Sequence, residues 1–297
     1  MRRKGLPIDG IVLLDKPLGM SSNAALQITK KLFKAAKAGH TGTLDPLASG
    51  LLPLCFGEAT KFSADLLHAS KTYVAQVKLG QTTTTGDLEG EYVKHRPVTV
   101  TLADIESALE QFRGDIMQVP PMFSALKRDG KVLYELAREG VEVEREARRI
   151  TISRLLIQGF ENDVLTIEVT CSKGTYIRVL AEDIGEALGC GAHLVGLRRT
   201  EVADLTVAEA VTIQALEQMT PEARLLALAP IDRLMQTLPK VTLDQEQTTR
   251  FCHGQRLPLA LEPCERVRVY GPENKMVGTA RVTEHGVLAP ERLIANK

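Results

Sequence analysis

The sequence predicts an α/β (α+β) protein whose large domain is built on a mainly antiparallel mixed sheet. Strand-like and helix-like patterns are mixed along the chain, without the regular alternation of a doubly wound fold. The 297 residues, 44% hydrophobic and 25% charged, are typical of one large or two medium globular domains. After about Pro239 the pattern changes to short strands separated by Gly and Pro turns. We therefore expect a large domain over residues 1–238 and a small β-rich domain over residues 239–297.

The first third of the chain is expected to alternate between strands and helices. An apolar run over residues 8–15 predicts a strand, which a Lys-Pro pair would end. Ser21 and Ser22 can cap a helix over residues 23–36, where apolar side chains recur at helical spacing. The expected order continues with a Gly-rich loop over 39–50, a strand over 51–56, a helix over 58–69, a strand over 73–79 and a polar loop over 82–90.

The middle and the end of the chain follow the same mixed pattern. Thr101 can cap a helix over residues 101–112, which an Arg-Gly pair closes. An Asp129–Gly130 turn precedes a second helix over residues 132–138. The expected order continues with strands over 150–157 and 164–171, a helix over 176–188, a strand over 193–200 and, near the C-terminus, strands over 266–270, 275–282 and 286–289.

The composition excludes several classes of protein. No apolar run approaches the ~20 residues of a membrane-spanning helix, and the basic start leads into no signal-peptide core. The five cysteines form no C-x-x-C pair, so we expect reduced thiols in a cytoplasmic protein. The six histidines show no zinc-ligand spacing, and we expect no metal site. No heptad pattern is evident, which favours a monomer.

The charges are balanced overall but unevenly distributed. The chain carries 37 Lys and Arg against 37 Asp and Glu, yet Asp9 and Asp15 are the only acids before His40. The basic residues of that segment are Arg2, Arg3, Lys4, Lys16, Lys30, Lys31, Lys34 and Lys37. Charge alone supports two interpretations equally, a surface that faces nucleic-acid phosphates or a solvated helix face.

The segment from Gly39 to Gly50 is the most unusual stretch of the sequence. Its glycines allow sharp turns and a close approach to a ligand, and His40 and Asp45 could both face one cavity. Neither the phosphate-loop pattern nor the dinucleotide-binding pattern is present. Composition alone favours an ordinary loop in which Asp45 bonds its own backbone before Pro46.

Residues 39–46 resemble the catalytic motif of pseudouridine synthases, and specifically that of the TruB family of bacterial tRNA pseudouridine synthases. Five further motifs fall in that family's order, and the resemblance covers roughly residues 8–235. These motifs are residues 15–22 (DKPLGMSS), 71–73 (KTY), 120–127 (PPMFSALK), 171–178 (CSKGTYIR) and 191–199 (GAHLVGLRR). Several ordered motifs are far more specific than any one of them.

The resemblance implies isomerisation of uridine to pseudouridine at position 55, in the TΨC loop of tRNA. The target base would be flipped out of the RNA, released from its N-glycosidic bond and rejoined through C5, without a cofactor. Such an enzyme would bind the T-arm, and a role in assisting tRNA folding is also implied. By the same resemblance, residues 239–297 would form a PUA-like RNA-binding domain.

The resemblance also assigns roles to individual residues. Asp45 would be the catalytic carboxylate in a desolvated pocket, and Arg178 the guanidinium that keeps it ionised. Tyr73 would stack on the target base and assist proton transfer. Tyr176 and Leu197 would line the uracil pocket.

Other interpretations stay open for several residues. Arg178 could instead form a helix-surface pair with Glu182, four residues further on, and the tyrosines could simply pack in the core. His40 would occupy the space that the flipped base leaves, or be a buried structural histidine. Lys16 would brace the catalytic loop or contact a phosphate of the substrate.

Two other function classes compete with the isomerase. The basic segment and the β-rich C-terminal part would also serve a non-catalytic RNA-binding or RNA-folding protein. A hydrolase could use Ser49 or Ser172 with a histidine and Asp45, although the G-x-S-x-G nucleophile pattern is missing. Only the isomerase and the RNA-binding protein predict a steep dependence of tRNA affinity on salt concentration. The lysines before the 39–50 segment could then contact the RNA backbone.

Overall fold

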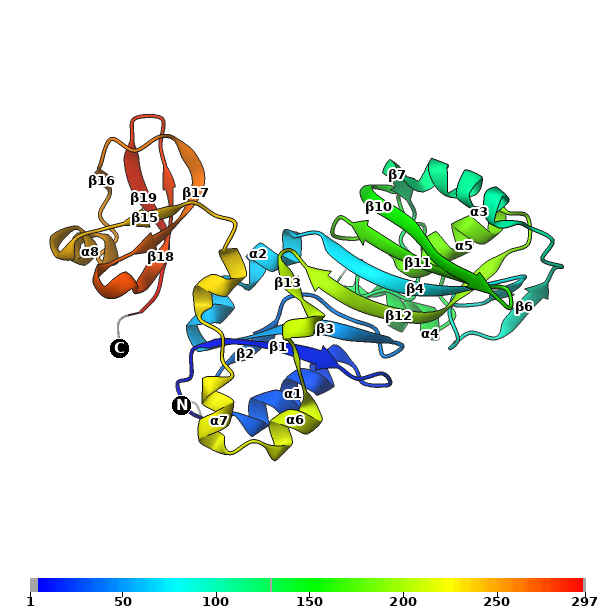
Figure 1. Cartoon of the computed structure of the whole chain (residues 1–297), viewed down its shortest axis with the longest axis horizontal. Coiled ribbons are helices and arrows are strands. Elements are labelled where there is room, and N and C mark those ends of the chain that lie inside the picture. Colours follow the sequence, from blue (N-terminus) through cyan, green and yellow to red (C-terminus); the bar gives the residue numbers. More distant parts are fainter. Residues whose placement is uncertain (1–4, 129, 296–297) are drawn as a thin grey trace.

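The large sheet joins apolar strands that are far apart in the sequence (Figure 1). The computed structural model describes residues 5–128 and 130–295. Ten strands of these described residues form one sheet, in which only β1–β14 and β3–β12 are parallel neighbours. In sheet order the strands are β14 (Val211–Thr212), β1 (Gly10–Lys16), β3 (Ala48–Phe56), β12 (Ala192–Val202), β4 (Lys71–Leu79), β11 (Val164–Cys171), β10 (Arg148–Glu161) and β7 (Gly114–Gln118), with β2 (Ala38–His40) paired to β3 and β13 (Leu205–Thr206) paired to β12. The predicted fold class is therefore confirmed.

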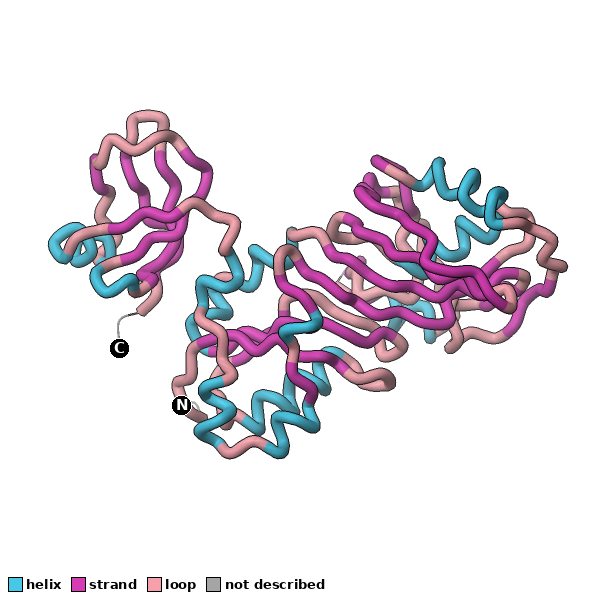
Figure 2. Tube along the Cα trace, viewed as in Figure 1, coloured by secondary structure: helices cyan, strands magenta, loops and turns pink. Residues whose placement is uncertain are grey.

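Side chains of β1 alternate between two hydrophobic clusters, because successive residues of a strand point to opposite faces of the sheet. Val12 and Leu14 pack with α1 (Ser22–Leu32) and α6 (Ile213–Gln218), whereas Ile11 and Leu13 pack with α2 (Ser63–His68) and the short 3-10 helix over Ile231–Met235. Figure 2 shows how the helices accompany the strands of the sheet. The helices that accompany the large sheet are α1 (Ser22–Leu32), α2 (Ser63–His68), α3 (Leu102–Leu109), α4 (Leu133–Arg138), α5 (Ile177–Ala187), α6 (Ile213–Gln218) and α7 (Pro221–Leu226). Within the described ranges, no helix is both long and apolar enough to span a bilayer.

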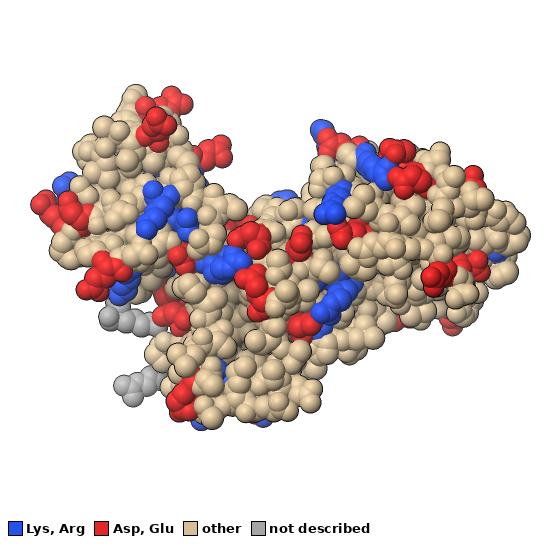
Figure 3. All heavy atoms as spheres, viewed as in Figure 1, with Lys and Arg blue, Asp and Glu red and all other residues tan. Residues whose placement is uncertain are grey.

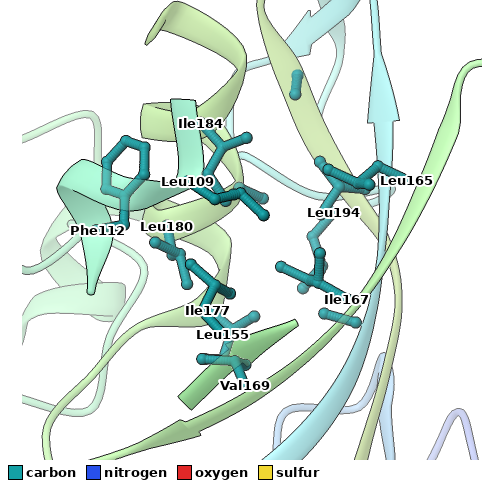
Figure 4. Close-up of a cluster of buried hydrophobic side chains, with 14 of the residues drawn as sticks. Leu109, Phe112, Leu155, Leu165, Ile167, Val169, Ile177, Leu180, Ile184 and Leu194 are labelled. Carbon is teal, nitrogen blue, oxygen red and sulfur yellow. The ribbon is translucent and has the colours of Figure 1, made fainter. Parts of the chain in front are cut away.

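Helix α5 packs its apolar stripe against the other half of the sheet (Figure 4). Ile177, Leu180 and Ile184 recur at helical spacing and meet the alternating apolar side chains of β11, such as Ile167. Leu109 of α3 closes the same cluster. This packing fixes the rotation of α5, and therefore the direction in which its other side chains point.

Helix α1 ends four residues earlier than the sequence predicts. Lys34 has a positive φ of 49°, and the N–H groups of Lys34 and Ala35 donate to the carbonyls of Lys31 and Lys30, at 3.0 Å each. These two bonds form a Schellman motif, which ends a helix at a left-handed residue. Lys34 and Lys37 therefore lie beyond the helix and not on it.

Other element boundaries also differ from the predictions. The expected helix over residues 58–69 is split into a 3-10 helix (Gly57–Lys61) and α2, because the backbone of buried Phe62 (φ −106°) leaves the helical region. The polar loop expected over residues 82–90 is flanked by a hairpin of β5 (Gln81–Thr83) and β6 (Tyr92–His95). A second hairpin pairs β8 (Lys127–Arg128) with β9 (Lys131–Val132), and Asp129 of the expected turn lies outside the described residues.

The C-terminal residues form a second sheet with a hydrophobic core of its own. Phe251 of α8 (Gln245–Cys252) packs there with Val269 and Leu288. In sheet order the strands are β15 (Lys240–Thr242), β17 (Cys264–Tyr270), β18 (Met276–Val282), β19 (Val287–Leu293) and β16 (Leu257–Pro258). The Tyr270 hydroxyl donates to Oδ2 of Asp232 (2.6 Å) and links this sheet to the rest of the chain. The β-rich C-terminal part is therefore confirmed.

We expect Lys34→Gly to stabilise the protein by about 0.5–1 kcal/mol. A residue with a Cβ costs roughly 1–2 kcal/mol in the left-handed region, and glycine avoids this cost although it loses more entropy on folding. Lys34→Ala is the matched control, because it removes the same charge but keeps the Cβ, and it should bring no gain. Urea unfolding followed by circular dichroism measures both variants, and equal stabilities would contradict the role of Lys34 in ending the helix.

Candidate active site

Asp45 lies in the loop that joins β2 to β3, and hydrogen bonds hold this loop in place. Ser22, the first residue of α1, accepts a hydrogen bond from the Leu44 N–H (2.7 Å) and donates one to the Leu44 carbonyl (2.8 Å). The Gly19 N–H donates to the Pro46 carbonyl (2.8 Å). Composition alone favours an ordinary loop in which the Asp45 side chain bonds its own backbone. Among the described residues this side chain makes no such bond, so the ordinary-loop interpretation is wrong.

The Arg178 guanidinium lies between two carboxylates. Its Nη2 is 3.1 Å from Oδ2 of Asp45, and its Nη1 is 3.1 Å from Oδ2 of Asp87. Nη2 also donates to the Phe123 carbonyl (2.7 Å), and Nη1 also donates to the Thr85 carbonyl (3.4 Å). Only 8% of Arg178 is exposed, and a buried guanidinium needs such partners to offset its lost hydration. The structure thus brings Asp45 and Arg178 together.

The alternative partner of Arg178, Glu182, is not used. Within the described residues, the ion pairs of Arg178 are those with Asp45 and Asp87. The helix-surface interpretation is therefore wrong, because the packing of α5 turns Arg178 inward. Glu182 is itself half-buried, and this burial raises the pKa of its carboxyl to about 7.

Asp87 is a candidate functional residue that sequence reasoning missed. It lies in the loop between β5 and β6, where its Oδ1 accepts hydrogen bonds from the Thr85 hydroxyl (2.6 Å) and the Glu89 N–H (3.0 Å). This turn leaves Oδ2 for Arg178. The sequence around Asp87 shows only the pattern of a turn, so no local signal indicates its distant partner.

Asp45 is half exposed although its partner is buried. Solvent reaches 54% of the Asp45 side chain but only 10% of the Arg178 side chain. The expectation of a desolvated carboxylate is therefore wrong for the protein alone. The guanidinium and the fixed loop set the position of this carboxylate, and the exclusion of water from it requires a bound ligand.

Asp45 and Arg178 line a pocket of about 290 Å³. This volume is near the lower end of the roughly 300–1,000 Å³ that is typical of small-molecule pockets. Tyr73 on β4, Leu197 on β12 and Tyr176 just before α5 line the same pocket. Five of the predicted site residues therefore meet in one place, because β4 and β12 are neighbours in the sheet and α5 packs beside them.

The two tyrosines of the pocket remain neutral at pH 7. Burial raises the pKa of the Tyr73 phenol and of the Tyr176 phenol above the ordinary value. Gln118, at the end of β7, holds the backbone of Tyr176: its Oε1 accepts from the N–H (2.8 Å) and its Nε2 donates to the carbonyl (3.1 Å). A neutral phenol suits stacking on a base and hydrogen-bond donation.

Lys16 does not line the pocket. It is fully buried, and its ammonium group donates to the carbonyls of Met20 (2.6 Å) and Pro17 (3.0 Å). Lys16 therefore braces the turn in which the Gly19 N–H bonds the Asp45 loop. A phosphate contact, the other interpretation, is wrong because solvent does not reach the side chain. Burial lowers the pKa of Lys16 to about 8.

His40 ends β2, at the base of the same loop, and does not line the pocket either. Its Nδ1 is buried and has no hydrogen-bond partner among the described residues. Burial lowers the pKa of the imidazole below its ordinary value, so the ring is neutral at pH 7. A space-filling role and a structural role both fit this position.

Arg199 is a second residue that sequence reasoning did not single out. It is buried, and its Nε donates to the Leu51 carbonyl (2.8 Å) while its Nη2 donates to the Gly42 carbonyl (3.3 Å). A Cβ at Gly50 would lie 2.2 Å from the Arg199 carbonyl oxygen, and φ of Gly50 is +100°. Arg199 therefore joins β3, β12 and the Asp45 loop, and the close approach of its backbone requires glycine at position 50.

Neither serine of the hydrolase hypothesis meets a histidine. Oγ of Ser49 lies 3.4 Å from Nη1 of Arg198, and Oγ of Ser172 accepts from the Thr151 N–H (2.9 Å). In the part of the chain that the structure describes, neither serine has a histidine partner, so the hypothesis lacks a general base. The described residues also contain no group of three or more His, Cys, Asp and Glu side chains placed to hold a metal ion.

The lysines of the basic segment form no ion pairs within the described residues. The side chains concerned are Lys30, Lys31, Lys34 and Lys37, of which only Lys30 is half-buried. Arg2, Arg3 and Lys4 lie outside the described residues. Acidic and basic side chains are interspersed over the face that Figure 3 shows. The phosphate-facing and the solvated interpretation of these lysines both stay predictions.

Three family models match consecutive stretches of this chain, which together span residues 30–294. A model of the TruB family pseudouridylate synthase N-terminal domain matches residues 30–177, and a model of the tRNA pseudouridylate synthase B C-terminal domain matches residues 178–238. A third model, pseudouridine synthase II TruB, C-terminal, matches residues 239–294. The tRNA pseudouridine synthase B of Burkholderia mallei is 58% identical over 99% of both chains. That of Ralstonia nicotianae is 57% identical over 97% of this chain and 94% of its own.

Solved structures share the fold. A chain in a Cbf5–Nop10–Gar1 complex superposes with a TM-score of 0.73 at 25% identity, over 96% of this chain and 84% of that one. A chain in an H/ACA ribonucleoprotein bound to a substrate RNA containing 2′-deoxyuridine superposes with a TM-score of 0.75 at 23% identity, over 100% and 91%, which shows the fold alone. With more than half of its residues identical to those of curated members, the chain belongs to the TruB family of pseudouridylate synthases and is an isomerase.

Proposed function

We propose that this enzyme converts uridine 55 in the TΨC loop of tRNA to pseudouridine, with Asp45 as its catalytic carboxylate. The observation that carries the proposal is the half-exposed Asp45 carboxylate, which the buried Arg178 holds beside a pocket of about 290 Å³. Relatives that are 57–58% identical over nearly the whole chain are named tRNA pseudouridine synthase B, which supports tRNA as the substrate. The T-arm and position 55 follow from the family resemblance.

The reaction moves the glycosidic bond without a net gain or loss of atoms. The N1–C1′ bond of uridine breaks, the uracil turns in the pocket and a C1′–C5 bond forms; C5 then releases its proton and N1 takes one up. Asp45 acts at the junction of sugar and base as a nucleophile or a base, and either role needs the ionised carboxylate. Arg178 binds the Asp45 carboxylate and holds it in place, while Asp87 balances the guanidinium charge from its other side.

The pocket residues Tyr73, Tyr176 and Leu197 are proposed to hold the flipped uracil. Flipping a nucleotide out of a stack costs a few kcal/mol. Stacking of the flipped base on an aromatic side chain stabilises the complex by about 1–3 kcal/mol per base and so offsets part of this cost. Tyr73 also lines the pocket and is proposed to relay the proton that C5 loses after the new bond has formed. His40 is proposed to fill the space that the base leaves in the RNA, and Lys16 to keep the catalytic loop in position.

We further propose a catalytic domain over residues 1–238 and a PUA-like RNA-binding domain over residues 239–297. The second sheet begins at Lys240 and has its own core, which supports this division. The enzyme would act as a monomer in the cytoplasm without a metal or cofactor. Phosphate contacts of the basic segment would supply affinity for tRNA, and binding of the T-arm would also assist tRNA folding.

Replacing Asp45 by Asn should abolish catalysis but preserve RNA binding. The amide has nearly the same shape but cannot act as nucleophile or base. We expect no tritium release from tRNA labelled at uridine C5, with an affinity within about twofold of the wild type. Asp163→Asn is the matched control, because Asp163 is an exposed residue paired with Lys78. Tritium release by Asp45→Asn at more than a few per cent of the wild-type rate would refute the proposed role.

Replacing Asp87 by Asn should slow catalysis without abolishing it. The amide keeps a hydrogen-bond acceptor for Arg178 but removes a buried counter-charge, so we expect kcat to fall about 10–100-fold, which corresponds to about 1.4–2.8 kcal/mol. Glu186→Gln serves as control, since it neutralises an exposed partner of Arg96. Single-turnover rates of tritium release test this, and an unchanged kcat would show that Asp87 does not position Arg178.

The stability of the protein should depend on pH through Lys16. A lysine whose pKa is about 8 in the folded state and 10.5 when unfolded destabilises the fold while it is protonated. This cost disappears as the pH rises from about 8 to 10.5, so the free energy of unfolding should increase by about 1–3 kcal/mol relative to Lys16→Met. Urea unfolding at a series of pH values measures the difference, and parallel pH profiles for the two proteins would contradict it.

A further inference from the structure

One segment of the chain contacts the active site at three successive points. Gln118 holds the backbone of Tyr176, the Phe123 carbonyl accepts from Arg178, and Ser124 lines the pocket. The backbone of Ser124 is itself fixed, because its N–H donates to the Met122 carbonyl (2.8 Å) and its carbonyl accepts from the N–H of residue 134 (3.1 Å). The Ser124 side chain therefore enters the pocket from a held backbone.

The hydroxyl of Ser124 is buried without a hydrogen-bond partner. Ser124 is 6% exposed, and among the described residues no group meets its Oγ with hydrogen-bond geometry. The Tyr176 phenol interacts weakly with Oγ, and this interaction lowers the pKa of the phenol against the larger effect of burial, which raises it; the two oxygens lack the geometry of a full hydrogen bond. An unsatisfied buried hydroxyl costs about 1–3 kcal/mol, and most buried polar groups avoid this cost.

We propose that Ser124 is a substrate-binding residue whose hydroxyl donates a hydrogen bond to a carbonyl oxygen of the flipped uracil. The inference rests on the proposed function, because it takes the pocket to be the uracil site. Ser124 lines the same pocket as Asp45 and Arg178. When the sugar of a nucleoside meets Asp45, its uracil ring therefore comes within reach of the Ser124 side chain. The substrate then supplies the partner that the protein lacks.

The symmetry of uracil makes one fixed donor useful throughout the reaction. Turning the free ring by half a turn about the axis through N3 and C6 exchanges N1 with C5 and O2 with O4. A hydroxyl that binds one carbonyl oxygen before the turn therefore meets the other carbonyl oxygen after it. Ser124 can hold the ring in both orientations without moving, which keeps the loose base in the pocket.

The test compares Ser124→Ala with a matched control at a similar hydroxyl. Thr248 in α8 also carries a buried hydroxyl without a partner among the described residues, and it lies in the C-terminal sheet region. Both variants, Ser124→Ala and Thr248→Val, remove an unpaired hydroxyl, so neither should lower the midpoint of urea unfolding. With uridine in the tRNA, we expect single-turnover pseudouridine formation to fall about tenfold for Ser124→Ala and to stay unchanged for Thr248→Val.

Substrate analogues then identify the group that Ser124 contacts. tRNA assembled with 2-thiouridine or 4-thiouridine at position 55 replaces one carbonyl oxygen by sulfur, a weaker acceptor. If the hydroxyl binds that oxygen, the tenfold loss of Ser124→Ala should shrink to about twofold or less with at least one of the two analogues. Product formation is measured by nuclease digestion and chromatography.

Three results would overturn the inference. They are a Ser124→Ala rate within twofold of the wild type, an equal loss with all three substrates, and a fall in stability that parallels the fall in rate. If the wild type and Thr248→Val both form no pseudouridine in the uridine tRNA, the proposed function itself fails. If those two proteins are active and one of the three results is found, only the role of Ser124 fails.

Discussion

The burial of a single guanidinium organises the active site. Arg178 is removed from solvent, and a buried positive charge is tolerated only when carboxylates and carbonyls surround it. Its partners come from the loop before β3, the loop between β5 and β6, and the segment after β7. These three parts of the chain must therefore meet at α5, so correct packing of the large sheet and formation of the site depend on each other.

The backbone of the Asp45 loop is held by hydrogen bonds, although the Asp45 carboxylate is exposed to solvent. Ser22, Gly19 and Arg199 hold the backbone on either side of the carboxylate, so little reorganisation is needed when substrate arrives. The carboxylate itself stays open to solvent. A preformed but uncovered site suits a large substrate, because the RNA can supply the surface that excludes water.

Helix α2 links the pocket to the C-terminal sheet. Leu67 lines the pocket, while Asp65, two residues before it, forms an ion pair with Arg266 of β17 (Figure 1). The neighbouring 3-10 helix adds a hydrogen bond from Lys61 to the Leu293 carbonyl (2.9 Å). The position of the second sheet is therefore set by contacts that start at the edge of the active site, which places both on one continuous framework.

The sequence by itself determined most of the long strands, most helices and the antiparallel character of the sheet, and it placed Asp45 and Arg178 among the candidate site residues. Apolar periodicity, capping residues and an ordered motif set are local signals. The buried positions of the strands and helices follow the apolar periodicity. The tertiary structure alone decided that Lys34 ends α1, that Asp87 shares Arg178, that Lys16 is buried and that Ser124 has no partner. Such features depend on which residues meet across the sheet, and a pattern along the chain does not record the contacts between distant segments.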